Sequence, residues 1–367
     1  MSDLVTIDGS HGEGGGQIVR TSLSLAALRG VPVRIVNLRA GRRRPGLQAQ
    51  HLAAVRMAAL ICDAEVTGAE LGSTTLHFAP RSRPLPGEYA LDVAQMRKGG
   101  SAGAVTLVLQ TVLIPLAFAG GSSRITLTGG THVAWSPPAH YLAHVYLPTL
   151  ARWGYRASVH LDRWGWYPIG QGVLRATIQP HEPTAPAFDV PAPGKIRRVW
   201  GLSAASNLPR HVVERQRRRA LEALRKAGLR AEVDEVDAPT RSKASKGSFM
   251  FLVAECDYVA AGFSALGARG KPAERVAQEA VRDLRAWQRS GAALDPHLAD
   301  QVILPLALAS EPATFTTSAV TRHLLTNAWA VEQFLPVRIA VEGDVEQPGR
   351  VRITPSVSFQ TGAFQMG

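Results

Sequence analysis

A histidine near the C-terminal end of the chain has neighbours that suit chemistry on phosphate. His323 lies in the segment RHLLTNAWAVEQFLP, where Thr326 and Asn327 follow at i+3 and i+4, close enough on a helix for the side chains to orient one another. Asp300 and Gln301 precede it in LADQVILP. A neutral imidazole can attack an activated phosphoryl group and form a phosphoramidate, which forms and breaks readily. The alternative is a surface histidine at the start of a helix.

A glycine-rich run near the N-terminus, GEGGGQ over residues 12–17, follows an expected strand and opens an expected helix. In that arrangement backbone N–H groups and the helix N-terminus can face an anion. The run matches neither a Walker A loop nor a Rossmann fingerprint. Glu13 would repel phosphate unless a divalent cation lay between them, so it is a candidate ligand of Mg²⁺ or Mn²⁺. The alternatives are a sterically demanding turn and a glutamate that stabilises the first helical turn.

Arginines gather close to this run, one on the same helix and four in the loop LRAGRRRPGLQAQH before the second helix. They are Arg20, Arg39, Arg42, Arg43 and Arg44. Loop arginines beside Gly and Pro favour phosphate binding over simple solvation, although at least one of the last three is expected to be solvated. Gln50 and His51 follow on the helix, where an isolated histidine is more often structural than catalytic.

Two aromatic segments each leave two interpretations open. Trp135 lies in THVAWSPPAH, a loop stiffened by two prolines, and RWGWYPIGQG over residues 163–172 is a Trp/Tyr-rich turn between expected strands. Exposed rings of this kind can stack on a nucleobase. Packing inside the protein is the simpler interpretation of both, and for the second segment it is the favoured one.

The composition narrows the class of protein. Of the 41 basic residues only six are Lys, and against 29 acidic residues the formal net charge is +12. Arg is the side chain best suited to bidentate phosphate contact, so an anionic partner is favoured, although an Arg bias inherited from a GC-rich genome would give the same excess. Cys62 and Cys256 are isolated, which excludes a disulfide scaffold and fits a reducing compartment.

Neither export nor membrane insertion is expected. The first ten residues are polar and strand-like, unlike the charged and then apolar start of a secretory signal. The longest apolar stretch, residues 104–119, is interrupted by Gln110 and Pro115 and falls short of the ~20 residues that a membrane span requires. We therefore expect a cytoplasmic protein with no membrane partner.

The coarse order of expected elements repeats along the chain. A first βαβαββ unit has strands at 4–7, 33–38, 64–67 and 74–78 and helices at 14–29 and 45–62. The same order recurs over 89–178, at a spacing of roughly 90 residues, and a third unit is expected from 272 onward. A unit with two helices on one face of its sheet cannot bury its apolar surface alone, so the units should pack together through their helices.

A proline-rich stretch over residues 180–193 has the composition of a linker. Beyond it, residues 211–226 form a basic amphipathic helix pattern, and 249–254 and 258–263 resemble strands. We expect an α+β fold with a main domain over 1–184 and 273–367, made of three βαβαββ units. A smaller inserted α/β domain would occupy 185–272.

Taken together, these segments resemble the RNA 3′-terminal phosphate cyclase family. The motifs that carry the resemblance are IDGSHGEGGGQIVRTSLSL, LRAGRRRPGLQAQHLAAV, GSAGAVTLVLQTVLIPL, GGTHVAWSPPAHYL, LADQVILPLALA and RHLLTNAWAVEQFLP. They occur in the family's order and cover nearly the whole chain except the insert. The resemblance implies repeated βαβαββ units, like those of enolpyruvyl transferases, and an inserted α/β domain. It also implies conversion of an RNA 3′-phosphate to a 2′,3′-cyclic phosphate with ATP and a divalent metal.

The resemblance also implies roles for individual residues. His323 matches the nucleophile that carries AMP as a phosphoramidate, with Arg20 and Arg42 as further catalytic residues, and Glu13 matches the metal-binding glutamate. The residues that match the nucleotide site are Gln110, Pro137, Phe263, Asp300, Gln301 and His323. Those that match the site for the RNA end and its phosphate are Arg20, Arg39, Arg42, Gln50 and His51.

Two departures and two rival functions accompany the resemblance. Gln171 replaces a glycine of the family's turn, and Trp164 stands where a basic residue is typical. A cyclase-like branch serves ribosomal RNA processing without activity, but it lacks the histidine at the position of His323. An enolpyruvyl transferase is disfavoured by the HLLTN segment and by the insert. The physiological RNA, the use of DNA or 5′ ends, the choice of ATP or GTP and a homodimer stay open.

Overall fold

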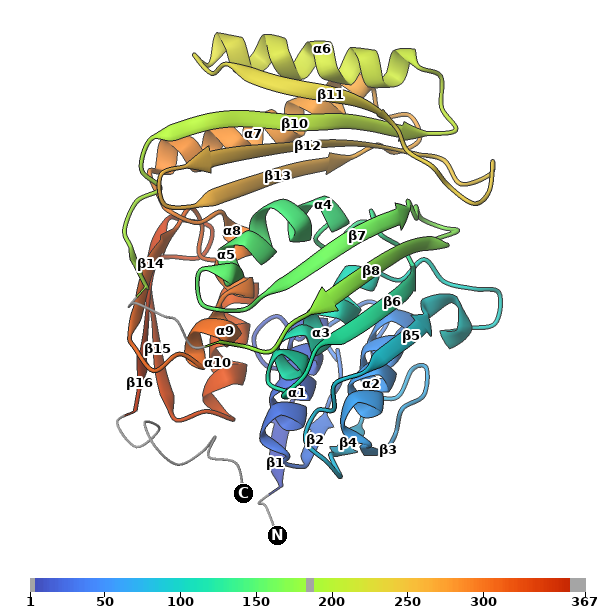
Figure 1. Cartoon of the computed structure of the whole chain (residues 1–367), viewed down its shortest axis with the longest axis vertical. Coiled ribbons are helices and arrows are strands. Elements are labelled where there is room, and N and C mark those ends of the chain that lie inside the picture. The colour runs from blue at the N-terminus through green and yellow to red at the C-terminus, as the bar shows by residue number, and fades with distance from the viewer. Residues whose placement is uncertain (1–3, 183–187, 357–367) are drawn as a thin grey trace.

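The computed structural model describes residues 4–182 and 188–356, so the expected boundary at 184/185 lies outside the described residues (Figure 1). The first βαβαββ unit is present as expected. Its elements are β1 (Val5–Asp8), α1 (Gly16–Arg29), β2 (Val33–Val36), α2 (Ala49–Cys62), β3 (Glu65–Thr67) and β4 (Leu76–Ala79). Its sheet has the order β1-β2-β4-β3, in which β1 and β2 are parallel and the other pairs antiparallel.

The second unit repeats this topology with the order β5-β6-β8-β7. Its strands are β5 (Glu88–Asp92), β6 (Ser123–Gly129), β7 (Ala157–Arg163) and β8 (Gly172–Ile178). Its helical segments are η1 (Val93–Met96), α3 (Val105–Ala117), α4 (Ala139–Tyr141), η2 (Leu142–Tyr146) and α5 (Leu147–Ala151). The repeat that the sequence predicts is therefore confirmed.

The third unit has the same strand order but is interrupted in sequence. Its elements are β9 (Phe188–Val190), α8 (Pro296–Gln301), α9 (Ile303–Ala307), β14 (Ala313–Thr317), α10 (Arg322–Glu332), β15 (Val337–Glu342) and β16 (Gly349–Pro355). The sheet runs β9-β14-β16-β15, and β9 is parallel to β14. β9 has only three residues and lies inside the proline-rich stretch, which explains why the sequence pattern does not reveal it.

The inserted module forms a fourth sheet, of order β11-β10-β12-β13, with two long helices. Its elements are β10 (Ile196–Ser206), α6 (His211–Lys226), β11 (Ala231–Asp237), β12 (Gly247–Cys256), β13 (Ala260–Leu266) and α7 (Ala273–Ser290). α7 buries Val276, Ala280, Leu284 and Trp287 in the module's own core. Because β9 pairs with β14 and α7 packs on the module, the module extends from β10 to α7 and differs at both ends from the expected 185–272.

The helices of the three units meet in the centre of the molecule (Figure 1). α1 packs against α2, α3 and α10, and one continuous core extends from Ile7 in β1 to Ile353 in β16. The module shares this core through β12, where Phe249 and Phe251 face the central core and Met250 and Leu252 face α6 and α7. Since side chains alternate across a strand, β12 is apolar on both faces and fixes the module against the second unit.

The structure bears on two further expectations from the sequence, one about the turn at 163–172 and one about membrane-spanning helices. The turn at 163–172 keeps a left-handed backbone at Gln171, with φ of 59°, and Trp164 is buried with its ring 3.9 Å from that of His132. The two tryptophans of this turn, Trp164 and Trp166, therefore pack inside the protein, while Tyr167 is exposed. Within 4–182 and 188–356, no helix is long and apolar enough to cross a membrane.

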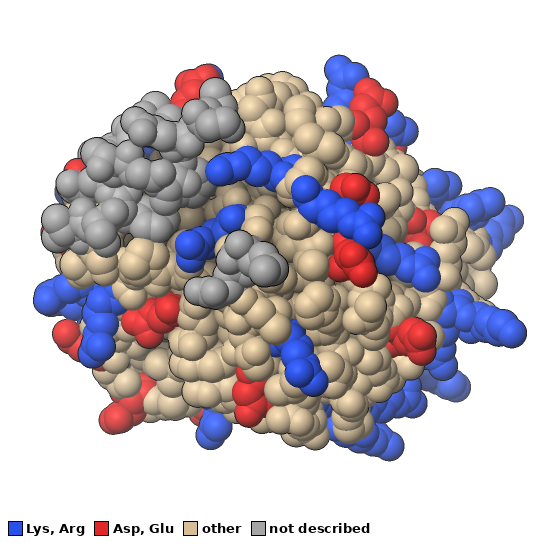
Figure 2. Space-filling model, turned by 90° about the horizontal axis from the view of Figure 1, so that it is seen from below, with Lys and Arg blue, Asp and Glu red and all other residues tan. Residues whose placement is uncertain are grey.

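Charge is unevenly distributed on the surface. Figure 2 shows the face seen from below in the view of Figure 1, where basic side chains outnumber acidic ones and gather toward the right of the view. This agrees with the net charge of +12. A surface of this kind attracts polyanions.

A buried carboxylate joins three parts of the fold. Asp295, at the N-cap of α8, accepts hydrogen bonds from Tyr141 Oη at 2.8 and 2.9 Å and from the backbone N–H of Gly262 at 3.2 Å. It also accepts from the N–H groups of His297 and Leu298, both at 3.0 Å. Burial raises the pKa of Asp295, although His297 and these hydrogen bonds oppose the shift. One side chain thus ties the second unit, the module and the third unit together.

Asp295→Ala should lower the free energy of unfolding by about 2–5 kcal/mol, because it leaves several buried donors unsatisfied. Urea denaturation followed by circular dichroism measures the loss. Asp92→Ala is the matched control, since Asp92 caps η1 through a single N–H of Ala94 and should cost about 1 kcal/mol. Equal losses in the two variants would contradict the role given to Asp295.

Candidate active site

A cavity of about 590 Å³ lies where the units and the module meet. Its walls come from α1, α3, the loop before α4, β13, α7, α8 and the start of α10. Every position that the sequence assigns to a nucleotide site lines this one cavity: Gln110, Pro137, Phe263, Asp300, Gln301 and His323. Arg20 lines it as well. The chain thus brings together residues that are up to 303 positions apart, from 20 to 323.

His323 is positioned by the start of α10. Thr321 caps this helix by accepting a hydrogen bond from the N–H of Leu324 at 3.0 Å. His323 Nδ1 lies 2.7 Å from Glu13 Oε2, which leaves Nε2 as the ring nitrogen available to a ligand. Burial lowers the pKa of His323, Arg20 and Arg42 lower it further, and Asp300 opposes them. The lowered pKa favours the neutral imidazole, which is the form that can act as a nucleophile.

The glycine-rich loop is held against α10. Glu13 N–H donates to Thr326 Oγ1 at 3.1 Å, and the ring of His11 stacks on Trp329 with centroids 3.8 Å apart. A side chain at Gly12, whose φ is +58°, would collide with Thr326. Thr326 thus holds the loop that carries Glu13, which differs from the expected partnership with His323 along the helix.

A second layer of hydrogen bonds surrounds the cavity. Gln110 Nε2 donates to Gln301 Oε1 at 2.6 Å, which joins α3 to α8. Asn327 Oδ1 accepts from Thr21 at 2.6 Å, and its Nδ2 donates to the carbonyl of Asp300 at 2.6 Å. Asn327 therefore fixes α10 against α1 and α8.

Two opposite charges are half-buried in the cavity wall. Burial lowers the pKa of Arg20 to about 10, so its guanidinium stays protonated at pH 7, and its Nη2 donates to Gln17 Oε1 at 2.8 Å. Burial raises the pKa of Asp300 to about 6, opposed by His323, His297 and Arg20. A low-dielectric wall that keeps both charges close to His323 strengthens their action on a bound phosphate.

Four residues assigned to the RNA end lie beside this cavity instead of lining it. Arg42 pairs with Glu13 Oε1. Arg39 Nη1 donates to the carbonyls of Arg44 and Gly46 at 2.8 and 2.7 Å, so this group holds its own loop. Gln50 lines a separate hollow.

The His51 ring contacts the protein on two sides: Nδ1 faces the N-terminus of α2, and Nε2 faces the glycine-rich loop. Its Nδ1 accepts from the N–H of Gln48 at 3.1 Å, which completes the cap of α2. Burial lowers the pKa of His51 well below its ordinary value, and Arg39, Arg20 and Arg42 act in the same direction. The neutral ring must carry its proton on Nε2, which lies so close to Gly16 that a side chain there would collide with it. His51 can therefore donate toward the glycine-rich loop.

Glu13 fits a cation that is shared with a phosphate ligand. Its Oε2 is buried and lies 2.7 Å from His323 Nδ1, and a carboxylate oxygen has a second lone pair that a cation can share. Among the described residues, no group of three or more His, Cys, Asp or Glu side chains could hold a metal ion. One carboxylate completed by phosphate oxygens and water is a common way to bind Mg²⁺.

For Trp135 the sequence leaves stacking on a base and packing inside the protein as alternatives, and it does not predict His297, Tyr141 or Trp287 as cavity residues. Trp135, with φ of 64°, is 98 % exposed at the cavity rim, so its ring does not pack inside the protein. His297 lies three residues before Asp300 and lines the cavity, and this helical spacing is the signal that could have found it. Tyr141 and Trp287 follow only from the tertiary fold.

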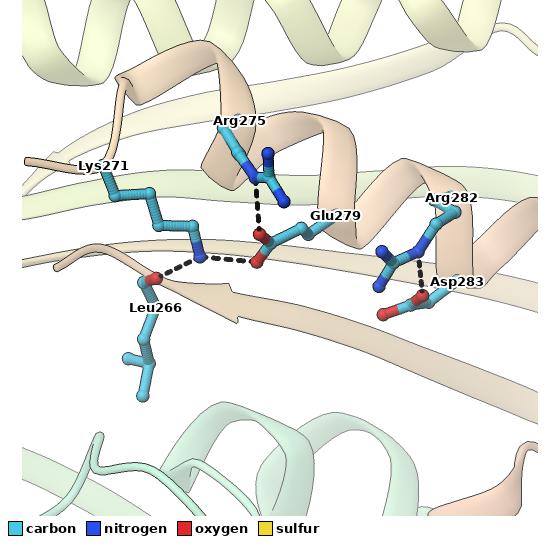
Figure 3. Close-up of polar contacts among 6 residues, drawn as sticks. All are labelled: Leu266, Lys271, Arg275, Glu279, Arg282 and Asp283. Atoms are coloured by element: carbon cyan, nitrogen blue, oxygen red, sulfur yellow. Dashed lines mark hydrogen bonds and ion pairs between the residues drawn. The ribbon is translucent and has the colours of Figure 1, made fainter.

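Strand β13 and helix α7 of the module form one side of the cavity, and Figure 3 shows polar contacts within this part of the module. Lys271 Nζ donates to the carbonyl of Leu266 at 2.8 Å and pairs with Glu279, which joins the end of β13 to α7. Further along α7, Arg282 pairs with Asp283, a cavity residue. The contacts of Lys271 fix the end of the strand that carries Phe263.

Comparisons with known proteins agree on one family. The model of the family described as RNA 3′-terminal phosphate cyclase matches residues 11–341. A protein of that name from Methylococcus capsulatus is 52% identical over 350 residues, 95% of this chain and 96% of its own. Another from Methanopyrus kandleri is 43% identical over 357 residues, 96% of this chain and 99% of its own.

A solved structure gives only a weak match. The enolpyruvyl transferase NikO from Streptomyces tendae aligns with 48% of this chain and 33% of its own, at 17% identity and a TM-score of 0.27. A similarity this low carries no argument about fold or function.

The raised pKa of Asp300 predicts a pH dependence of stability. An exposed Asp has a pKa of about 3.9, so between pH ~4 and ~6 the folded state binds more protons than the unfolded state. This carboxyl therefore lowers the free energy of unfolding as the pH rises through that window, by about 2–3 kcal/mol in total.

Asp300→Asn should remove this decline, so that the variant gains stability relative to the unmodified protein between pH 4 and pH 7. Urea denaturation at several pH values measures the difference. Asp344→Asn, at an exposed position, is the control and should change nothing. Parallel curves for Asp300→Asn and the unmodified protein would show that Asp300 is not held in a charge-disfavouring environment.

Proposed function

The chain belongs to the RNA 3′-terminal phosphate cyclase family, and we propose that it uses ATP to convert an RNA 3′-phosphate to a 2′,3′-cyclic phosphate through a histidine–AMP intermediate. The family and its relatives support an RNA-processing enzyme of this kind. One observation carries the mechanism. His323 has a neutral ring at the junction between a nucleotide-sized cavity and the glycine-rich loop, with Glu13 against its Nδ1.

In the first proposed step, Nε2 of His323 attacks the α-phosphorus of ATP held in the cavity. A P–N bond forms, the bond from the α-phosphorus to its bridging oxygen breaks, and pyrophosphate leaves. Glu13 would hold a divalent cation, which supplies positive charge to the phosphates. Arg20 adds a fixed cation in the wall, where it offsets the charge that develops on the phosphate oxygens.

In the second step, an oxygen of the RNA 3′-phosphate attacks the phosphorus of the histidine–AMP. The P–N bond breaks and His323 is restored. The neighbouring 2′-OH then attacks the activated 3′-phosphate, loses its proton, and expels AMP as the ring closes. This intramolecular attack needs the 2′-OH, the phosphorus and the leaving AMP oxygen held in line. A site that restricts the motion of the ribose and the phosphate raises the effective concentration of the 2′-OH at the phosphorus.

The RNA end would lie beside the glycine-rich loop, outside the nucleotide cavity. Arg42 is already at this place through its pair with Glu13, and His51 faces the same loop. We assign Arg39 and Gln50 to this side of the site as well, with Arg39 acting through the loop that it holds. A cytoplasmic location and a homodimer remain predictions from the sequence.

His323→Ala should abolish covalent labelling of the protein by α-³²P-ATP, with a fall of at least about a thousandfold, because no other group would take the role of nucleophile. Gel electrophoresis under denaturing conditions measures the label. His160→Ala, an exposed histidine on β7, is the control and should label normally. Labelling that persists in His323→Ala would remove His323 as the nucleophile, and no label in the unmodified protein would favour the non-catalytic branch of the family.

Glu13→Gln should raise the Mg²⁺ or Mn²⁺ concentration needed for half-maximal labelling by about tenfold or more, because the amide lacks the charge that binds the cation. A metal titration of the initial labelling rate measures the shift. Glu88→Gln, an exposed carboxylate on β5, controls for loss of one negative charge. An unchanged titration in Glu13→Gln would place the cation elsewhere.

A further inference from the structure

A second hollow, of about 390 Å³, lies beside the reaction centre. It is lined by Arg44, Gln48, Ala49, Gln50, Leu71, Gly72, Arg97, Ser101 and Gly103. The first unit supplies one side of it, from the loop before α2 and the turn at 71–72. The second unit supplies the other side, from the segment that follows η1.

The charge of this hollow is one-sided. Arg44 and Arg97 are exposed, and neither side chain makes an ion pair or a hydrogen bond within 4–182 and 188–356. Among the described residues, no Asp or Glu lines the hollow. Two guanidinium groups without an acidic partner, beside the polar side chains of Gln48, Gln50 and Ser101, suit an anion that carries several phosphate oxygens.

The rim of the hollow is built rigidly. Gly72 N–H donates to Leu47 O at 2.8 Å, and Leu47 N–H donates to Ser73 O at 3.0 Å, which fixes the loop of Arg44 to the 71–73 turn. Gly46 has φ of +73°, and a side chain there would collide with Gly72. A site formed in advance loses less conformational entropy when a ligand binds.

The hollow adjoins the proposed place of the RNA 3′-phosphate. Arg44 follows Arg42 by two residues, and Gln48 in the hollow is hydrogen-bonded to His51 by its backbone. Gln50 Oε1 also accepts from the N–H of Ala104 at 3.4 Å, so the two units are joined at this point. A chain whose end reaches Arg42 and His51 would run directly into the hollow.

We propose that this hollow binds the phosphodiester backbone of the RNA nucleotides that precede the 3′-phosphate, with Arg44 and Arg97 as its phosphate contacts. The proposal rests on the proposed function, since it takes RNA as the substrate. It adds a subsite that sets how tightly the RNA body is held. Contacts of this kind position a strand without reading its sequence.

The double variant Arg44→Ala/Arg97→Ala tests the subsite by equilibrium binding, without need of catalysis. The probe is a ten-nucleotide single-stranded RNA with a 5′ fluorophore and a 3′-phosphate, followed by anisotropy across a salt series. Near 0.1 M salt, we expect the variant to bind the RNA at least about tenfold more weakly than the unmodified protein does. The slope of log K against log salt should decrease in magnitude by about 1.4, because each lost phosphate contact contributes about 0.7 for a single strand. Affinity for a nucleoside 3′-phosphate, which cannot reach the subsite, should not change.

Arg338→Ala/Arg352→Ala is the matched control, because it removes the same charge from exposed positions on β15 and β16. It should change the slope by much less than the Arg44/Arg97 variant. Equal changes in the two double variants would overturn the subsite, because the effect would then be one of net charge alone. An equal loss for the ten-nucleotide RNA and the nucleoside 3′-phosphate would also overturn it, because the two arginines would then bind the terminal phosphate.

Covalent labelling by α-³²P-ATP separates this proposal from the proposed function. The Arg44/Arg97 variant should label at the normal rate, because ATP occupies the other cavity, and normal labelling also shows that the variant is folded. If the unmodified protein fails to label but the variant still loses RNA affinity, the histidine–AMP mechanism fails and the subsite stands. If labelling is normal and RNA affinity is unchanged, the subsite fails and the mechanism stands.

Discussion

The structure depends on one buried carboxylate, Asp295, at the point where the second unit, the third unit and the inserted module meet. Its oxygens satisfy the hydroxyl of Tyr141, a backbone N–H of the module and the N-terminus of α8. A charge is stable at such depth only if hydrogen bonds surround it, so the three parts must keep their relative positions. The large cavity lies at this junction, so the same hydrogen bonds make its wall rigid. Asp295 itself forms part of that wall.

The site divides the proposed reaction between two hollows, with His323 and Glu13 between them. The larger one carries the apolar and amide side chains that suit a base and the half-buried Arg20 and Asp300. Within the described part of the chain, the smaller one carries two arginines that make no ion pair, and no acidic residue lines it. This separation follows from the repeated architecture, because α1 of the first unit and α10 of the third unit line the larger cavity together with the module, while the start of α2 meets the second unit at the smaller hollow. Two anionic substrates could then approach one histidine without occupying the same space.

The sequence predicts what local patterns determine. Helices α1 and α2 and the βαβαββ order depend on motifs or periodicity within single segments. Of the six residues assigned to the nucleotide site, all but Phe263 come from the motifs that carry the family resemblance. β9 has three residues and is recognised only by its pairing with β14. The assignment of α7 to the module depends on which sheet its apolar face meets, and the contact of Arg39 with its own loop depends on the backbone at Arg44 and Gly46. The exposure of Trp135 is likewise a tertiary property that a proline-rich loop leaves open.

The central claim is that His323 itself carries AMP, and its local sequence makes a direct measurement possible. Trypsin should release residues 323–338, HLLTNAWAVEQFLPVR, in which His323 is the only histidine and no lysine occurs. Mass spectrometry of the protein after incubation with ATP and Mg²⁺ or Mn²⁺, under alkaline conditions that preserve a phosphoramidate, locates the adduct. The account predicts AMP on this peptide, lost on acid treatment. AMP on a different peptide, or an acid-stable adduct on this one, would contradict it.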